Sequence, residues 1–301
     1  MPELPEVETI VRGLRKRVIG RRILKVIVKN PRAVRPQKPT AFARPISGKV
    51  ILTVSRNGKW ICFRLSDDGY LWAHLGMTGR FRWNEPDSHA RVIFQLDGQA
   101  TLVFSDIRTF GRLALGPSDA LEPPGVTLGV DPIHDEVSPK YLRDHFQRRT
   151  AAVKDLLLNQ EIVSGIGNIY ATEILFEARI HPLRPANSLT LKECRLLVKC
   201  IRSCLERAIR YGGTTISDFL TLDGEPGGFE EHIKIYGRQG QPCPNCGALL
   251  ERYVLHQRSG VFCPRCQRRH PALACPPKAE CGIQENSPLL LQEKKRGGRN
   301  R

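Results

Sequence analysis

Four cysteines near the carboxyl end of the sequence are arranged as two closely spaced pairs. Cys243 and Cys246 form one C-x2-C pair, and Cys263 and Cys266 form the second after an interval of sixteen residues. Four thiolates at this spacing fit a tetrahedral Zn(II) site with no open position. We therefore expect one structural zinc ion and a finger that is too short to fold without it. The sequence Arg258-Ser-Gly, between the two pairs, is expected to form the turn of a hairpin.

The chain carries a large surplus of positive charge. Of its 301 residues, 47 are Lys or Arg and 30 are Asp or Glu, which gives a formal net charge of +17. Such a surplus favours a polyanionic partner, above all nucleic acid, through phosphate contacts and counterion release. A membrane surface is disfavoured, because the arginines are spread along the chain and not confined to one amphipathic helix.

The first residues do not resemble a secretory signal. Glu3, Glu6 and Glu8 stand where a basic segment and an apolar core would be needed, and no apolar run approaches the ~18 residues that span a bilayer. We expect a soluble, cytoplasmic protein, in which cysteines serve as metal ligands more often than in disulfides. Outside the zinc pairs, four cysteines are interpreted as core or surface thiols and two are left without a role: Cys62, Cys194, Cys200 and Cys204 in the first group, Cys275 and Cys281 in the second.

The first part of the chain predicts one helix followed by strands. Apolar residues between Pro5 and Val18 recur at helical spacing. Beyond them, β-rich stretches are separated by turn sequences such as Asp97-Gly98. Six strands are expected, over 24–29, 50–55, 60–65, 70–75, 91–96 and 101–104. Short antiparallel strands of this kind indicate a sandwich or a barrel.

The second part of the chain predicts helices. Residues 116–138, rich in Pro, Gly and Asp, are typical of a linker. Helices are expected over 142–147, 151–158 and 190–211, the last of which starts at a capping box, Thr190-Leu-Lys-Glu193, and ends at two glycines. The tail from Pro271 is basic at its end and is predicted to be disordered.

The chain starts Met-Pro-Glu-Leu-Pro-Glu, a sequence that could supply a reactive amine at the amino terminus. Removal of Met1 would leave Pro2 with a free secondary amine. An α-amino group titrates near pH 8, about two units below a lysine, so a useful fraction is unprotonated at neutral pH. Such an amine can attack a sugar carbon and form a positively charged iminium ion, with Glu3 beside it to move protons. The alternative is an ordinary amino terminus.

Three further motifs suit nucleic acid. Met77, flanked by glycines in His-Leu-Gly-Met-Thr-Gly, could wedge between base steps or simply fill a core. Arg108 and Phe110, in Asp-Ile-Arg-Thr-Phe-Gly, pair a cation with a ring that can stack on a base. In Ser-Gly-Ile-Gly-Asn-Ile-Tyr-Ala, glycines precede Asn168 at the start of a helix, which predicts a phosphate site made of backbone amides. The motif lacks the Lys of a P-loop, so nucleotide binding is not expected.

Taken together, five motifs resemble those of bacterial formamidopyrimidine-DNA glycosylases. They are the Pro-Glu-Leu-Pro-Glu start, the Met and Arg–Phe motifs, the glycine–Asn motif and the four-cysteine finger, in this order over residues 2 to about 269. The resemblance implies an α+β, multidomain fold: an N-terminal antiparallel β-sandwich with an N-terminal helix (2–115), a linker (116–138), a helix–two-turn–helix domain (139–234), a four-cysteine zinc finger (235–269) and a basic tail (270–301).

The resemblance also implies an activity and its residues. The protein would be a DNA repair glycosylase and abasic-site lyase that excises oxidised purines and cuts the strand by β,δ-elimination. The implied catalytic residues are Pro2 as nucleophile, Glu3 as proton donor, Lys59 for β-elimination and Arg258 for δ-elimination and phosphate binding. The implied DNA-binding residues are His89, Arg108, Arg149, Lys154 and Asn168, with Met77, Arg108 and Phe110 at the gap left by a flipped nucleotide.

Further implications concern partners and mobility. The partner would be damaged double-stranded DNA, and the protein would be a monomer that needs zinc but no small-molecule cofactor. A flexible loop over the lesion would fall within 217–229, whose glycines suit mobility.

Two alternatives stay open at this point. Endonuclease VIII-type enzymes, which act on oxidised pyrimidines, typically have Gly where this chain has Leu4. A non-catalytic zinc DNA-binding protein would retain Met1. The chain also departs from the family pattern, because it continues to residue 301 where the family usually ends just after the last cysteine pair.

Overall fold

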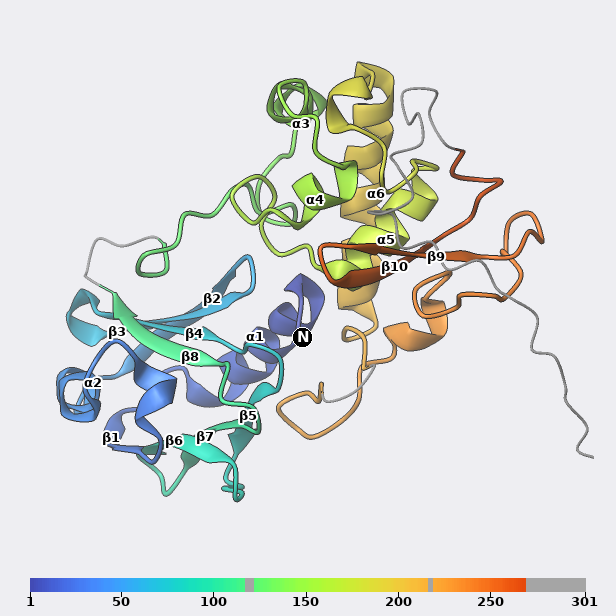
Figure 1. The fold of residues 1–301 in the computed structure, drawn as a ribbon. Helices are drawn as coiled ribbons and strands as arrows, with labels where there is room; N and C mark the ends of the chain where they lie inside the picture. Colours follow the sequence, from blue (N-terminus) through green and yellow to red (C-terminus); the bar gives the residue numbers. More distant parts are fainter. Residues whose placement is uncertain (117–121, 216–218, 269–301) are drawn as a thin grey trace, which may run out of the picture.

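The computed structural model describes residues 1–116, 122–215 and 219–268. Figure 1 shows a β-sandwich on one side and the helices α3 to α6 with the β9–β10 hairpin on the other. The start of α1 (Leu4–Val18) lies at the junction between them.

The sandwich consists of two four-stranded antiparallel sheets, in the orders β1-β6-β7-β5 and β2-β3-β4-β8. The strands are β1 (Ile23–Val28), β2 (Ile51–Asn57), β3 (Trp60–Leu65), β4 (Tyr70–His74), β5 (Gly79–Trp83), β6 (Ala90–Leu96), β7 (Thr101–Asp106) and β8 (Arg112–Gly116). The predicted fold class is therefore confirmed, and of the two alternatives for this domain the structure has the sandwich and not the barrel. The sequence prediction missed β5 and β8, which are short, and the helix α2 (Pro39–Ile46) between β1 and β2.

Helix α1 belongs to the sandwich by its packing. Its apolar side chains join the core between the two sheets: Val7, Ile10, Val11, Leu14 and Val18. Leu4, in the first turn, joins a different core, that of the helical domain. The helix thus starts in one body and continues in the other.

The helical domain contains α3 (Pro139–Phe146), α4 (Val153–Leu158), α5 (Asn168–Glu177) and α6 (Leu191–Arg210). The predicted capping box of α6 is present, since the Glu193 amide donates to Thr190 Oγ1 (3.3 Å) and the Thr190 amide donates to Glu193 Oε2 (2.8 Å). The cysteines Cys194, Cys200 and Cys204 are buried on the inner face of α6, as expected for core thiols, and Cys62 is buried in β3.

The finger contains an antiparallel hairpin of β9 (Glu251–Leu255) and β10 (Arg258–Phe262). Its turn is His256-Gln257, and both residues have positive φ. The predicted turn at Arg258-Ser-Gly was therefore wrong by two residues. Gly260 lies inside β10, and a Cβ there would come within 2.4 Å of the Tyr253 ring. This glycine therefore serves close packing and not a turn.

Among the helices in the described ranges, none has the length and apolar character required to cross a membrane. Cys275, Cys281 and the tail that contains them lie outside the described residues.

Candidate active site

The carboxylate of Glu3 is held at the amino end of α5. It accepts hydrogen bonds from three backbone amides, those of Gly167 (2.7 Å), Ile169 (2.9 Å) and Tyr170 (3.3 Å). A Cβ on Gly167 would come within 2.3 Å of the Glu3 side chain, so only glycine permits this approach. The positive end of α5 therefore binds a carboxylate of the protein itself.

This arrangement corrects the prediction of a phosphate site in the glycine–Asn motif. Three of the amides that would hold the phosphate are bonded to Glu3. Gly165 is close to α1 in the same way, since a Cβ there would lie 2.5 Å from Leu4 Cδ1. The glycines thus admit the first turn of α1 into the helical domain.

Burial raises the pKa of Glu3, although Lys59 and the three amides act in the opposite direction. Behind Glu3 lies a second buried carboxyl, Glu6, which accepts bonds from the amides of Glu3 (2.7 Å) and Thr214 (2.7 Å) and from the hydroxyl of Tyr170. Burial and the neighbouring Glu3 raise the pKa of Glu6 to about 7. The junction therefore holds two carboxyls that retain protons more readily than exposed ones do.

Lys59 lies in the turn between β2 and β3 and is buried. Burial lowers the pKa of its ammonium group, Glu3 opposes that effect, and Arg258 adds to it. Lys59 also helps to lower the pKa of His74 to about 4, mainly an effect of burial, which keeps His74 neutral. Glu3 and Arg258 therefore both act electrostatically on Lys59, and Lys59 acts on Glu3 and on His74.

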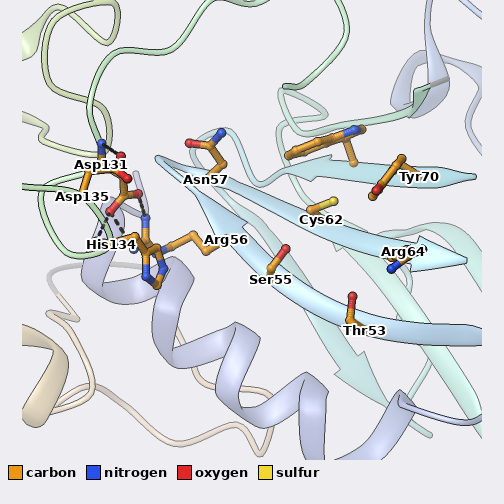
Figure 2. Close-up of a pocket in the computed structure, with 11 residues that line it drawn as sticks. Thr53, Ser55, Arg56, Asn57, Cys62, Arg64, Tyr70, Asp131, His134 and Asp135 are labelled. Carbon is orange, nitrogen blue, oxygen red and sulfur yellow. Dashed lines mark hydrogen bonds and ion pairs between the residues drawn. The ribbon is translucent and has the colours of Figure 1, made fainter. Parts of the chain in front are cut away.

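The turn before Lys59 is held by a buried ion pair (Figure 2). The Asp131 carboxylate binds the guanidinium of Arg56 through both oxygens and accepts the Gly58 amide (3.1 Å). Arg56 also donates to Glu8 of α1 (3.2 Å). The residues predicted to be a linker thus contribute a carboxylate that fixes this turn. A hollow of about 390 Å³ lies beside the pair, over the outer face of β2 and β3.

The finger approaches the junction from the other side. Asn168 donates from Nδ2 to the Ser259 carbonyl (3.0 Å), which joins α5 to β10 next to the exposed Arg258. Lys154 is buried with its Nζ 4.9 Å from the centroid of the Tyr253 ring, and burial lowers its pKa to about 8. Lys154 and Asn168 therefore both lie against the β9–β10 hairpin.

Three side chains project from two neighbouring loops of the sandwich. Met77 is 39% exposed and Phe110 is 57% exposed, and the Arg108 guanidinium lies 4.9 Å from the Phe110 ring centroid. We call these three residues the rim. Asp106 joins the two loops, because its carboxylate accepts the amides of Arg108 (3.1 Å) and Gly111 (2.6 Å) and the hydroxyl of Thr78. The alternative that Met77 fills a core is therefore wrong.

The remaining predicted residues lie in different places. Pro2 is buried next to Glu3, and Met1 before it is exposed. His89 lies beside the rim, since its carbonyl accepts the Asp106 amide (3.0 Å). Arg149 follows α3, where it lines a separate hollow of about 550 Å³.

The four finger cysteines converge as predicted. Their sulfur atoms all lie within 4.8 Å of one another, with Cys243 and Cys266 3.9 Å apart and Cys246 and Cys263 3.5 Å apart. A tetrahedral ion with Zn–S bonds of about 2.3 Å places its sulfurs about 3.8 Å apart, so the donor set fits one zinc ion. Because thiolates fill all four positions, the zinc is structural.

Sequence reasoning assigned no role to Glu6, His74 or the Arg56–Asp131 pair. The spacing of Glu3 and Glu6 matches a capping box, which could have revealed their contact. Arg56 and Asp131 lie 75 residues apart, and no local pattern predicts their pairing.

Comparisons with known proteins agree with this architecture. Residues 1–113 match the formamidopyrimidine-DNA glycosylase N-terminal domain, residues 128–220 match the formamidopyrimidine-DNA glycosylase H2TH domain, and residues 240–269 match the zinc finger found in FPG and IleRS. The formamidopyrimidine-DNA glycosylase of Thermus thermophilus is 44% identical over 276 residues, which cover 90% of this chain and 100% of the relative.

Two other matches extend the comparison. The formamidopyrimidine-DNA glycosylase of Symbiobacterium thermophilum is 41% identical over 300 residues, covering 97% of this chain and 98% of the relative, so that match reaches into the tail. The solved complex between the Lactococcus lactis Fpg and an abasic site containing DNA has a TM-score of 0.83 at 32% identity, covering 89% of this chain and 100% of that one.

A sandwich, a helical domain and a four-cysteine finger around a buried acid define a class of zinc-finger DNA glycosylases. The chain belongs to the formamidopyrimidine-DNA glycosylase family.

Proposed function

We propose that this protein is a DNA repair glycosylase and abasic-site lyase that removes oxidised purines, such as 8-oxoguanine and formamidopyrimidines, from double-stranded DNA. The observation that carries the proposal is the buried Glu3 carboxyl beside Pro2, held by three backbone amides, with the buried Lys59 close enough to affect its pKa. Membership in the family supports the same activity.

In the first step, the Pro2 amine, freed by removal of Met1, attacks C1′ of the damaged nucleotide. The bond from C1′ to the base breaks, and the base leaves with the proton that the Pro2 nitrogen gives up. Glu3 supplies a proton to the sugar oxygen as the ring opens, a role that suits a carboxyl whose pKa is raised by burial. The product is an iminium ion between Pro2 and C1′.

In the second step, the positive iminium acidifies the C2′ proton. Lys59 assists its removal, which suits an amine whose pKa is lowered by burial, and the 3′-phosphate leaves by β-elimination. A further elimination releases the 5′-phosphate, with Arg258 binding phosphate. The reaction of these residues requires no electron transfer.

The nucleotide has to leave the base stack before Pro2 can reach it, at a cost of a few kcal/mol. We assign Met77, Arg108 and Phe110 of the rim to the gap that remains in the duplex, since they are exposed and grouped. His89, Arg149, Lys154 and Asn168 are assigned to the DNA backbone.

The proposal extends to organisation. We assign residues 2–115 to a catalytic domain, 116–138 to a linker, 139–234 to a DNA-binding helical domain, 235–269 to the finger and 270–301 to a tail. The protein acts as a monomer in the cytoplasm, where it associates with the nucleoid through DNA.

Borohydride trapping tests the proposal. The purified protein is mixed with a duplex that contains 8-oxoguanine opposite cytosine, and borohydride reduces the iminium to a stable cross-link. Peptide mapping should place the cross-link on Pro2, and mass spectrometry should find no Met1. A cross-link on Lys59, or none with a processed amino terminus, would refute the mechanism. A retained Met1 with intact DNA binding would instead favour a non-catalytic DNA-binding protein.

A further inference from the structure

The hairpin of the finger lies against two helices of the helical domain (Figure 1). Asn168, the first residue of α5, donates to the Ser259 carbonyl of β10 (3.0 Å), and the Asp155 carboxylate of α4 lies 3.3 Å from the His256 ring at the hairpin turn. The amino end of α5 is also the place where Glu3 is held. The finger therefore contacts both helices close to the junction.

Lys154 of α4 lies between α5 and this hairpin. Its side chain is buried, and a buried ammonium group requires partners that favour its charge. The ammonium donates to Thr172 Oγ1 of α5 (3.3 Å), and its nitrogen lies 4.9 Å from the centroid of the Tyr253 ring of β9. The face of an aromatic ring attracts a cation at that distance. The charge on Lys154 therefore has one partner on α5 and one on the finger.

Gly260 makes room for this contact. Tyr253 and Gly260 are directly opposite each other in the hairpin. A Cβ on Gly260 would lie 2.4 Å from Tyr253 Cζ and 2.7 Å from Lys154 Nζ. The missing side chain therefore leaves free the place where the ammonium group meets the ring.

The ring of Tyr253 makes the contact, and its hydroxyl does not. Burial raises the pKa of the hydroxyl, with a smaller contribution from Asp155, so the side chain is uncharged. The hydroxyl is buried and has no hydrogen-bond partner among the residues that the structure describes. Tyr253 therefore acts on Lys154 through the face of its ring.

We propose that Tyr253 is a positioning residue, whose ring holds the charged Lys154 against α5 so that the finger keeps a positive charge at the junction. Burial is the main influence on this lysine and lowers its pKa to about 8. Glu3 and Asp155 favour the charged form, and Arg258 opposes it. Loss of the ring removes a further favourable partner, so Lys154 should then lose its proton at a lower pH.

Two variants disturb the contact from opposite sides. Tyr253→Leu removes the ring and keeps an apolar side chain, and Gly260→Ala places a methyl group between the ring and the ammonium. Tyr253→Phe keeps the ring and is the conservative partner. Val254→Ala is the matched control, because the next residue of β9 points to the other face of the hairpin. Each variant is also made together with Lys154→Met.

The titration of Lys154 needs no substrate. It is followed through the NMR signal of the lysine side chain, which Lys154→Met identifies by its loss. The midpoint near pH 8 should fall by about one pH unit in Tyr253→Leu and stay in place in Tyr253→Phe and Val254→Ala. A higher midpoint would show that the ring only excludes water, and an unchanged one that the ring does not act on the ammonium. Either result overturns the proposal.

The inference rests on the proposed function only in its kinetic assay, where the charge on Lys154 favours DNA. The value of kcat/KM for excision of 8-oxoguanine from a duplex should follow that charge. Tyr253→Leu should match the wild type within about 2-fold at pH 6 and be about 3-fold or more slower at pH 8. Gly260→Ala should also be about 3-fold or more slower at pH 8. Combined with Lys154→Met, neither substitution should cost more than about 2-fold, because the contact is already lost.

Other kinetic outcomes overturn the proposal. A loss in Tyr253→Leu that is equal at all pH values, or that persists in full without Lys154, would make Tyr253 a core residue of the finger only. The zinc content of each variant is measured, because the Tyr253 ring also packs against Phe262, next to Cys263 (ring centroids 5.9 Å apart). If Tyr253→Leu loses its zinc, Gly260→Ala decides, and zinc loss or wild-type excision in that variant overturns the proposal.

The two proposals fail in different ways. A protein that excises no oxidised base would defeat the proposed function and leave the titration of Lys154 as the test of its contact with Tyr253. A protein that excises 8-oxoguanine, but whose Lys154 titrates alike with and without the ring, would keep the proposed function and lose this inference.

Discussion

The junction at Glu3 and the rim at Met77 are built in opposite ways. At the junction, Glu3 and Glu6 are buried and the hydrogen bonds that orient them come from the protein itself. At the rim, Met77 and Phe110 are apolar and exposed, while only the backbone of their loops is fixed, through Asp106. At the junction, burial sets the pKa values of the carboxyls before any ligand binds. At the rim, exposed apolar side chains contribute favourable free energy only when another surface covers them.

Under the proposed function, the chemistry belongs to the junction and the opening of the duplex to the rim. Variants in the two regions should therefore fail at different steps. A substrate that needs base release and one that already lacks the base separate these steps.

The largest effect is expected from Glu3→Gln. An amide cannot donate the proton that the sugar oxygen takes up as the ring opens during base release, and loss of such a group typically slows a reaction by about 10²- to 10⁴-fold. Excision of 8-oxoguanine should fall by that factor, while cutting at a pre-formed abasic site should keep a measurable rate. Equal losses on both substrates would show that Glu3 has no specific role in base release. Glu206→Gln, at an exposed position of α6, is the control.

Cys263→Ala should have the next largest effect, because it acts on the support of both regions. Loss of one thiolate should release about one zinc ion per chain and unfold the hairpin that carries Arg258, since thiolates supply most of the stability of such a finger. Duplex binding should weaken at least ~10-fold. Zinc content by mass spectrometry and a binding titration are the measurements. A zinc-free variant that binds like the wild type would contradict this prediction.

Met77→Ala should produce a smaller and selective loss. Its side chain would replace stacking worth a few kcal/mol, so excision from a duplex should slow about 10-fold or more. Cutting at a pre-formed abasic site, where no base has to be extruded, should change less. Leu249→Ala, another exposed apolar position, is the control. Equal loss on both substrates would indicate misfolding of the loop and would contradict the view that the rim and the junction act at different steps.

The stability of the junction should depend on pH. The pKa of Glu6 is about 7 in the folded protein and near its ordinary value of 4.5 when unfolded. A raised pKa contributes stability that is complete below pH 4.5 and is lost as the pH rises through about 7. The wild type should therefore lose stability relative to Glu6→Gln between pH 5 and 8, which is seen as a fall in its relative melting temperature. The corresponding loss in the free energy of unfolding is at most about 3 kcal/mol. A constant difference would contradict the shift.

Removal of residues 271–301 should have the smallest effect. From Gln292 to Arg301 the tail has five basic residues and one acidic residue, which favours weak, salt-sensitive affinity for DNA. Borohydride trapping at low salt should survive the truncation. Loss of borohydride trapping in the truncated protein would show that the tail contributes to the function of the junction or of the rim.

Local patterns predicted the parts of this protein that short stretches specify. The finger is one example, because four thiolates at a fixed spacing leave few other arrangements. Helix α6 is another, since its cap and apolar stripe lie within one segment. The hairpin turn was predicted at the wrong place because Gly260 was interpreted as a turn residue. It is a glycine because it packs closely against Tyr253, and local sequence patterns do not reveal that contact.

The sequence alone determined which side chains could act: an amine behind Met1, an acid beside it, exposed apolar residues between glycines, and four zinc ligands. The tertiary structure decided what Glu3 faces, why Gly167 has no side chain, and which carboxylate holds the turn before Lys59. Those contacts join residues 75 to 167 positions apart. The pKa values follow from burial at such contacts, and burial is a property of the packed protein that local sequence does not encode.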